Sequence, residues 1–356
     1  MNNTLDEEIL VNPYIRVIPI NSNEVLIKHS GQSGYSKLFE DENKSGLMGK
    51  VFKFFKKPAT INNFLSLYDI EEADDVIGFI QECKTEHIIL KKTDDILNSY
   101  YKLLFNYKID ELADLTIGIV GLGILGSRVL SMLTNLGLQN FILIDDREVQ
   151  NSKIEEKYLH YREVPLGKKY VKIAKDEYSN VLEIYDAFST EYIEAFVKES
   201  DFIIYSQDML RSNLLHKLNS ACIEHNRVWL LSYIDGSECY AGPIFIPGST
   251  ACFNEVEIQL DASYPTYARN DYSLYREYVD DIASEDMILT LPHYADTLSG
   301  IVCNEVFKYL NSSNTSLSNS VVKIDMENME FDYINILKYP RCPACKKNSG
   351  FKNMFL

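Results

Sequence analysis

The chain has 356 residues, 46% of them hydrophobic, which allows one large core and a second, smaller one. A formal net charge of −17 argues against nucleic-acid and membrane-surface partners, because both require a positive surface. No apolar run reaches about 18 residues, and the N-terminus has no signal-peptide pattern. The seven scattered cysteines fit reduced thiols better than a disulfide framework, so we expect a cytoplasmic protein.

Residues 1–91 are predicted to form a small winged-helix-like domain, in which short strands are followed by three helices. Apolar residues from Leu47 onward recur at helical spacing, so a first helix is expected to end at Pro58. Thr60 is placed to cap the second helix. The expected elements are strands at 14–18 and 24–27, helices at 47–57, 61–68 and 71–83, and a strand at 88–90.

Predicted strands and helices alternate between residues 113 and 338, after a connecting helix at 92–112. This alternation predicts a Rossmann-like α/β fold, with a mostly parallel sheet and helices on both faces. Residues 339–356 are predicted to form a tail that folds back toward Cys252. The predicted strands include 115–120, 142–145, 202–205 and 228–231, and the later helices cover 213–225 and 298–310.

The most informative motif is the Gly-x-Gly-x-x-Gly turn at Gly121, Gly123 and Gly126, between a predicted strand and a predicted helix. Glycine is needed there because a side chain would keep the backbone away from a phosphate at the helix N-terminus. Asp145 ends the next strand about twenty residues later, where a carboxylate accepts ribose hydroxyls. The pattern predicts a nucleotide-binding unit, and a nicotinamide-dependent dehydrogenase is one alternative.

A Cys-x-x-Cys pair at Cys342 and Cys345 offers two thiolates to a structural zinc ion, which needs two further ligands. Cys252 and Glu255 are the natural second pair, although a carboxylate is an unusual companion to three thiolates. Two alternatives stay open. Either Cys252 is simply a small buried hydrophobic residue, or the tail carries a redox pair.

Together these motifs resemble the ThiF/MoeB family, the bacterial relatives of ubiquitin-activating enzymes. The resemblance covers roughly residues 98–346. It includes the glycine turn, the strand that ends at Asp145, Asp208 after the strand 202–205, the Gly-Pro to Pro-Gly segment at 242–248 and the closing Cys-x-x-Cys pair. It implies a site for ATP and magnesium at the glycine turn, with Asp145 on the ribose and Asp208 on the metal–ATP complex. It also implies a homodimer.

Within that family, the front domain and the segment 242–248 look most like proteins that serve ribosomally made, modified peptides such as bacteriocins. These include microcin-C-type peptide adenylating enzymes and the partner proteins of YcaO-type cyclodehydratases. The resemblance implies that the front domain binds a precursor's leader peptide as an added strand, through main-chain hydrogen bonds and side-chain pockets. The expected peptide-binding residues are Glu24, Val25, Leu26, Ile27, Lys28, His29, Ile77 and Ile80.

Three positions depart from the pattern of family members that adenylate a carboxylate. Those members carry an Asn, an Arg and a Lys that hold the ATP phosphates, and the corresponding residues here are Lys153, Glu156 and Tyr170. Two unit charges about 4 Å apart at an effective dielectric of about 20 interact by about 4 kcal/mol, so Glu156 is expected to repel a triphosphate strongly. Lys157 and Lys169, like Lys153, lie close enough in the sequence to restore the charge.

Two functions are compatible with these features. We favour a non-adenylating scaffold and activator that captures a leader peptide and docks a separate YcaO-type cyclodehydratase. The rival is a leader-guided, ATP-dependent adenylating enzyme. A DNA-binding regulator is disfavoured, because the lysines between residues 50 and 57 are better explained as a solvated helix face. His293 is expected to be structural.

Overall fold

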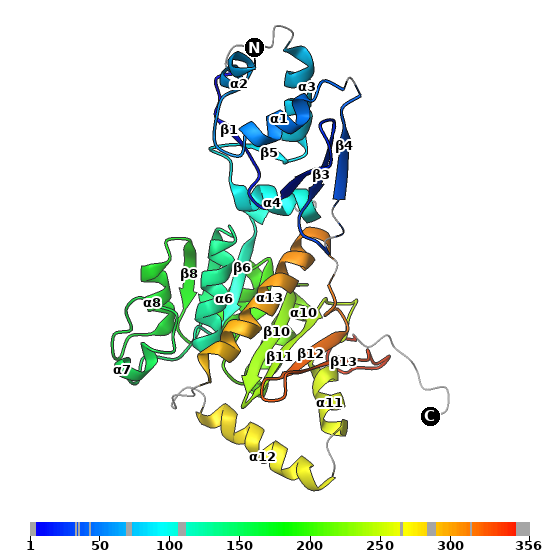
Figure 1. The fold of residues 1–356 in the computed structure, drawn as a ribbon. Helices are drawn as coiled ribbons and strands as arrows, with labels where there is room; N and C mark the ends of the chain where they lie inside the picture. Colours follow the sequence, from blue (N-terminus) through cyan, green and yellow to red (C-terminus); the bar gives the residue numbers. More distant parts are fainter. Residues whose placement is uncertain are drawn as a thin grey trace. The chain divides into compact units, whose positions relative to one another are not determined.

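The computed structural model describes residues 5–32, 34, 36–42, 44–68, 73–105, 112–263, 266–282, 290–313 and 315–346. The contacts within the chain divide it into two compact units, Met1–Asp110 and Glu111–Leu356. Figure 1 traces the helices and strands of both units. Across the described residues, no helix is both long enough and apolar enough to span a bilayer.

The first unit contains a three-stranded antiparallel sheet of order β2-β3-β4 and a two-stranded sheet formed by β1 and β5. The strands-then-three-helices order of the prediction is present, and β1 and β4 are additions to it. The elements are β1 (Ile9–Val11), β2 (Arg16–Pro19), β3 (Glu24–Lys28), β4 (Ser36–Glu40), α1 (Leu47–Phe54), α2 (Ile61–Leu67), α3 (Asp74–Thr85), β5 (Ile89–Lys91) and α4 (Ile96–Phe105).

The central strand of the three-stranded sheet is β3, which is hydrogen-bonded to β2 on one side and to β4 on the other. Side chains alternate between the two faces of a strand, and on β3 this places Val25 and Ile27 fully in the core. On the opposite face, Ile18, Leu26 and Leu38 pair across the three strands. Ile18 is 43% exposed and Leu38 is 46% exposed, so this face of the sheet carries an open apolar row.

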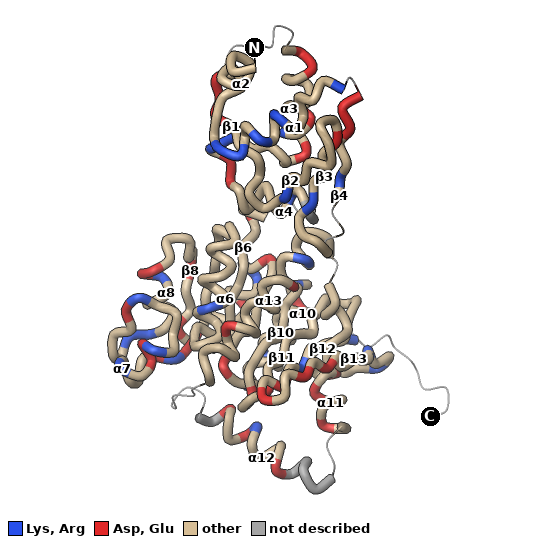
Figure 2. Tube along the Cα trace, viewed as in Figure 1, with Lys and Arg blue, Asp and Glu red and all other residues tan. Residues whose placement is uncertain are grey.

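Local sequence signals account for the helices of this unit. The hydroxyl of Thr60 accepts a hydrogen bond from the backbone N–H of Asn63 at 3.2 Å and so caps α2. On α1, Val51 is buried, whereas Lys50 and Lys53 are exposed. Figure 2 shows these lysines as a short basic stretch in a unit that also carries many acidic residues. The basic side of α1 is a solvated helix face.

The second unit is built on an eight-stranded sheet of order β13-β12-β11-β10-β9-β6-β7-β8. The five strands from β10 to β8 are parallel, and β11, β12 and β13 continue the sheet by antiparallel pairing. The predicted α/β class with a mostly parallel sheet is confirmed. The strands are β6 (Thr116–Val120), β7 (Asn140–Ile144), β8 (Val181–Tyr185), β9 (Phe202–Tyr205), β10 (Val228–Asp235), β11 (Glu238–Phe245), β12 (Ser320–Asp325) and β13 (Glu330–Asn335).

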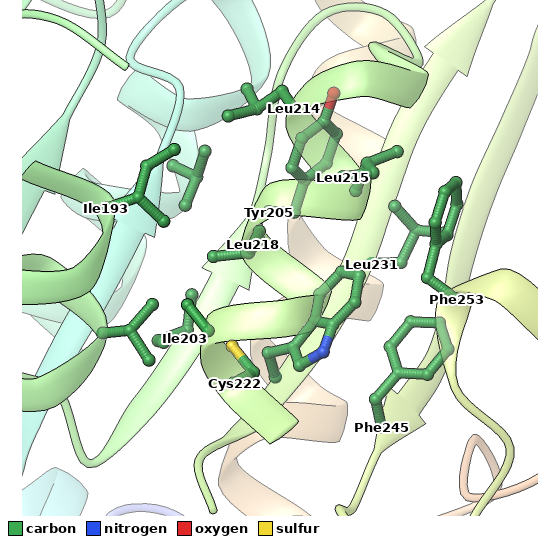
Figure 3. Packing of buried hydrophobic residues seen from close by; sticks show 14 of the residues in the cluster. Ile193, Ile203, Tyr205, Leu214, Leu215, Leu218, Cys222, Leu231, Phe245 and Phe253 are labelled. Carbon is green, nitrogen blue, oxygen red and sulfur yellow. The ribbon is translucent and has the colours of Figure 1, made fainter. Parts of the chain in front are cut away.

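Helices cover both faces of this sheet, which is why its central strands are apolar on both sides. On one face α6 packs against α13 (Figure 1), and on the other α9 packs against α10. Figure 3 shows the core beneath α9 and α10, where Tyr205 and Leu231 of the sheet meet Ile193 and Leu214 of the helices. The helices are α6 (Ile124–Asn135), α7 (Ser152–Glu155), α8 (Tyr170–Glu177), α9 (Thr190–Glu199), α10 (Ser212–Glu224), α11 (Phe253–Ser263), α12 (Thr266–Ile282) and α13 (Pro292–Ser312).

Candidate functional site

The candidate nucleotide cleft lies at the carboxyl edge of three neighbouring strands. β6 is paired in parallel with β7 on one side and with β9 on the other, so the residues that follow these strands meet at one edge of the sheet. They are the turn that begins at Gly121, the acid Asp145 and the acid Asp208. The structure therefore brings together the glycine turn and the two acids expected to contact a nucleotide.

The glycines of the turn are required by its geometry, as Gly121 and Gly123 show. Gly121 has a φ of 95°, a conformation that residues with a side chain rarely adopt. At Gly123 the reason is space, because a Cβ would lie 1.8 Å from Oδ2 of Asp208 and 2.6 Å from Nη2 of Arg147. The turn is thus closely packed against side chains of the same protein.

The backbone N–H groups of the turn are bound by the two acids. Asp208 accepts hydrogen bonds from the N–H groups of Ile124 and Leu125 at 3.0 and 2.8 Å, and so caps the N-terminus of α6. Asp145 accepts a hydrogen bond from the N–H of Leu122 at 2.6 Å. N–H groups at such a helix N-terminus are the ones that face a phosphate in a nucleotide site. Here carboxylates of the protein occupy that place.

A buried arginine lies between the two acids. Nη1 of Arg147 is 3.0 Å from Oδ2 of Asp208, and Nη2 is 3.0 Å from Oδ2 of Asp145. Its Nε donates a further hydrogen bond to Oδ1 of Asp145 at 3.2 Å. The Arg147 side chain is 7% exposed. The three side chains form a closed, charge-assisted cluster inside the cleft.

The charges of this cluster stabilise one another. Burial by itself would raise the pKa of Asp145, but the charge and hydrogen bonds of Arg147 outweigh burial and bring that pKa below its ordinary value. Burial acts to lower the pKa of Arg147, whereas the charges of Asp145 and Asp208 raise it well above its ordinary value. Asp145 and Arg147 are therefore both charged at neutral pH.

Tyr170 occupies the position where adenylating relatives are expected to carry a lysine. Its side chain is buried, and its hydroxyl donates a hydrogen bond to Oε2 of Glu155 at 2.6 Å. The guanidinium carbon of Arg147 lies 5.3 Å from the centre of the Tyr170 ring, within the range of a cation–π contact. Tyr170 thus supports Arg147 from the side and supplies no positive charge of its own.

The strong repulsion expected from Glu156 does not hold. Glu156 is exposed, and a solvated carboxylate interacts far more weakly than one at an effective dielectric of about 20. Lys153 and Lys157 are exposed as well, whereas Nζ of Lys169 donates to the carbonyl oxygen of Asp146. The feature that closes the cleft is the buried acid–arginine cluster.

The predicted metal ligands also come together, although 90 residues separate Cys252 from Cys342. The four candidate ligand atoms of Cys252, Glu255, Cys342 and Cys345 all lie within 4.8 Å of one another. The Sγ atoms of Cys252 and Cys342 are 3.6 Å apart, close to the roughly 3.8 Å expected for two thiolates on one tetrahedral zinc ion. The donor set therefore fits a structural zinc ion.

Glu255 holds the tail through its own hydrogen bonds. It is fully buried, and its carboxylate accepts from the N–H of Cys252 at 2.7 Å and from the N–H of Tyr339 at 2.6 Å. Burial raises the pKa of Cys345 to about 11. At Cys342, burial acts in the same direction, but nearby backbone N–H groups outweigh it and lower the pKa. Cys342 is the thiol of this pair that ionises more readily.

The peptide-binding residues predicted on β3 need correction, because β3 has no free edge. It is hydrogen-bonded on both sides, and Val25, Ile27 and Ile80 are fully buried. The hydroxyl of Tyr100 lies 3.0 Å from Nε2 of His29. A strand cannot be added beside residues 24–28. The outermost strands of this sheet are β2 and β4, and the far edge of each has no strand partner among the described residues. The edge of β4 can be followed in Figure 1.

Residues 99–344 match the model of the ThiF family. The chain belongs to the ThiF family. Ubiquitin-like modifier-activating enzyme 5 of Caenorhabditis briggsae is 26% identical over 162 residues, a match that covers 40% of this chain and 37% of that protein. Protein HesA of Nostoc sp. is 22% identical over 247 residues, covering 68% of this chain and 88% of HesA. This ThiF-family chain therefore spans about a third of the first relative's length and most of the second's.

Solved structures extend the likeness to the front unit of this ThiF-family chain. The microcin C7 biosynthetic enzyme MccB in complex with N-formylated MccA matches with a TM-score of 0.62 and 18% identity, over 95% of this chain and 100% of that chain. E. coli MccB has also been solved with ATP. A heterocyclase in complex with substrate and cofactor matches with a TM-score of 0.58 and 13% identity, over 95% of this chain and 39% of that chain. These likenesses establish the fold.

Two residues of this ThiF-family cleft have no counterpart in the sequence prediction, Arg147 and Gln207. Arg147 lies two positions after Asp145, which is not a signal in itself. Gln207 precedes Asp208 and is fully buried, and neither its side-chain oxygen nor its side-chain nitrogen has a hydrogen-bond partner. Buried unsatisfied groups of this kind are rare in ordinary cores and cost about 1–3 kcal/mol. The two unpartnered atoms of Gln207 are unusual for an ordinary core and make this residue part of the candidate site.

Proposed function

We propose that this ThiF-family chain is the leader-peptide-binding subunit of a complex that modifies a ribosomally made peptide, and that it does not itself adenylate. Its first unit would capture the leader of the precursor. Its Rossmann-like unit would dock a separate YcaO-type cyclodehydratase, which would use ATP to convert Cys, Ser or Thr residues into azolines. Homodimerisation is part of the proposal and is tested by light scattering.

The observation that carries the proposal is the far edge of β4, which is not paired with any strand in the described part of the chain. A strand at the edge of a sheet presents unpaired N–H and C=O groups, and an extended peptide can pair with them as an additional strand. In this unit the peptide would become a fourth strand beside β4. Main-chain hydrogen bonds would supply affinity, and the side chains around the edge would supply selectivity.

The side chains around that edge differ on the two faces of the sheet. On the outer face, Leu38 offers an exposed apolar contact. On the core face, α3 packs against β4, since the Phe79 ring lies 5.6 Å from the Phe39 ring and Nζ of Lys37 lies 3.6 Å from Oε1 of Glu82. Lys37 also pairs with Glu86. We expect a leader with apolar residues that contact Leu38 and Phe79 and a basic residue that faces the acids of α3.

The similar structures support this assignment. MccB was solved with the peptide MccA, and the heterocyclase was solved with its substrate. Both match over 95% of this chain, so the match includes the front unit. The heterocyclase chain combines a region of this fold with a larger region outside the match. That combination supports a ThiF-like unit working next to a cyclodehydratase.

The second candidate is an adenylating enzyme, and the MccB structure with ATP favours it. The cleft disfavours it, because Asp145 and Asp208 are bound to Arg147 and to the N–H groups of the glycine turn. Tyr170 replaces the expected lysine. Catalysis of phosphoryl or nucleotidyl transfer needs positive groups preorganised around the developing charge, and the guanidinium of the buried Arg147 is directed to carboxylates.

An N-methyl scan of the leader tests strand addition directly. The probe is a fluorescent leader segment of a candidate precursor peptide, titrated by anisotropy. Because alternate residues of an added strand donate to β4, N-methylation of every second residue is expected to weaken binding at least roughly tenfold, or about 1.4 kcal/mol. Methylation of the residues in between should have little effect. A flat profile, or the absence of binding, would overturn the proposal.

A matched pair of protein variants tests the location. Leu38→Asp changes the exposed residue at the β4 edge, and Leu67→Asp changes a residue of α2 that is 62% exposed. We expect roughly tenfold weaker leader binding for Leu38→Asp and wild-type binding for Leu67→Asp. Equal effects of the two variants would place the peptide elsewhere.

A further inference from the structure

The cleft of the second unit contains a cation that is part of the protein. In nucleotide sites that use magnesium, a divalent cation bridges the acids and the phosphate oxygens. Here the guanidinium of Arg147 contacts both acids, at 3.0 Å from Asp145 and 3.0 Å from Asp208. We infer that Arg147 is a built-in occupant of this cleft: its guanidinium takes the place of the divalent cation at Asp208, also holds Asp145, the acid expected on the ribose, and so excludes magnesium nucleotides. This inference rests on the proposed non-adenylating function and names the residue responsible.

The donors that would hold phosphate are already used. The N–H groups of Ile124 and Leu125 at the start of α6 bind Asp208, and the N–H of Leu122 binds Asp145. A phosphate oxygen would have to displace these carboxylates to reach the same donors. The carboxylates would then lose their hydrogen bonds while staying buried, which is unfavourable.

Space at the turn is also filled. Even a single carbon atom attached to Gly123 would come within 1.8 Å of Asp208 and 2.6 Å of Arg147. The backbone at Gly123 is therefore in direct contact with Asp208 and Arg147, and a ligand can approach this part of the turn only if one of these side chains moves. The glycine turn and the two acids of a magnesium-nucleotide site are therefore present in the chain, but their arrangement does not fit that ligand.

Arg147 is held in this position from several sides. Two hydrogen bonds fix it to Asp145, and Tyr170 lies against its guanidinium group. Tyr170 is itself fixed by its bond to the buried Glu155. Removing one partner from a buried ion pair is strongly unfavourable, so displacing Arg147 would weaken nucleotide binding by roughly 10²- to 10³-fold. The exclusion of magnesium nucleotides from the cleft therefore depends on Arg147 and does not require a repulsion by Glu156.

The test measures binding of Mn²⁺ alone by EPR and of fluorescent mant-ATP with magnesium. Wild-type protein is expected to bind neither in the cleft. Arg147→Ala leaves Asp145 and Asp208 without their cation and opens space, so we expect it to gain a Mn²⁺ site that the double variant Arg147→Ala, Asp208→Asn lacks. Arg162→Ala, which changes a side chain that is 90% exposed, is the control and should behave as wild type.

Two results would overturn the inference. One is Asp208-dependent binding of magnesium nucleotide by the wild-type protein, a measurement that stays available even if Arg147→Ala does not fold. The other is a folded Arg147→Ala variant that gains no Mn²⁺ site. Titration of the wild type with the leader peptide tests the proposed function separately, because the leader is assigned to β4 in the first unit and the cleft lies in the second unit. If leader binding fails while the cleft results hold, the proposed function fails alone.

Discussion

Replacing Arg147 by methionine removes the guanidinium and keeps an unbranched side chain. Asp145 and Asp208 then remain buried without a cation between them. Removing one partner of a buried ion pair costs about 3–5 kcal/mol. Only 7% of the Arg147 side chain is exposed, so solvent screening does not reduce this value much. For a unit of this size the loss corresponds to a fall in melting temperature of about 10 °C.

The pH dependence of the loss has a definite sign. In the wild type the folded pKa of Asp145 is lowered, so its stabilising contribution is complete above the unfolded pKa near 4 and disappears as the pH falls through the folded value. In Arg147→Met, Asp145 is buried without its cation, which raises its pKa. Acidification from about pH 7.5 to about pH 5 then moves Asp145 toward its neutral form, so the difference in stability from the wild type should shrink.

The single tryptophan provides the assay. Trp229 is 1% exposed and lies in the core of the second unit, so its fluorescence during urea unfolding reports on that unit. The control is Arg162→Met, which breaks an exposed ion pair of 3.9 Å to Glu177 and should change stability by less than about 0.5 kcal/mol. A stabilising role of Arg147 is refuted if Arg147→Met unfolds like the control, or if its loss of stability is equal at both pH values.

Three further predictions concern other parts of the second unit. Glu255→Gln removes the carboxylate that faces three thiols, so the zinc content after mild chelation should fall, and an unchanged zinc-to-protein ratio would contradict the assigned ligand. Gly242→Ala places a Cβ 2.7 Å from the carbonyl oxygen of Ser320, at a residue whose φ is 92°. It should destabilise the second unit by about 2 kcal/mol or more in the same urea assay. A variant with wild-type stability would count against this close packing of Gly242 and Ser320. The hydrogen bond to Glu257 raises the pKa of His216. The stability that this hydrogen bond contributes is therefore complete below the ordinary pKa near 6.5 and is lost as the pH rises through the higher pKa of the folded state. An imidazole NMR titration with a midpoint below 6.5 would contradict this prediction.

Much of the fold follows from local patterns. The alternation of apolar strands and amphipathic helices predicted the parallel sheet, and Thr60 was predicted to cap the second helix, because both features depend on neighbouring residues. β4 escaped prediction because Ser36–Glu40 has no β-branched residue and becomes a strand through pairing with β3. The central position of β3 is also a long-range property, since strand order is decided by pairing between distant segments.

The candidate site was predictable only in part. The glycine turn, Asp145 and Asp208 follow strand ends, so their meeting could be expected from a parallel sheet. The role of Arg147 depends on the meeting of two strand ends, which no short motif encodes. Glu155 is buried and Glu156 is exposed, because consecutive residues of a helix point in different directions. An alignment by motif spacing does not show which of the two side chains faces the interior.

ATP–pyrophosphate exchange by the purified chain tests the central claim most directly. The protein is saturated with precursor peptide, with binding verified by anisotropy in the same sample, and labelled pyrophosphate incorporation into ATP is followed. The account predicts leader binding with exchange at the level of a protein-free control. Exchange that depends on the peptide and is abolished by Asp208→Asn would show that the cleft is catalytic and would contradict the account.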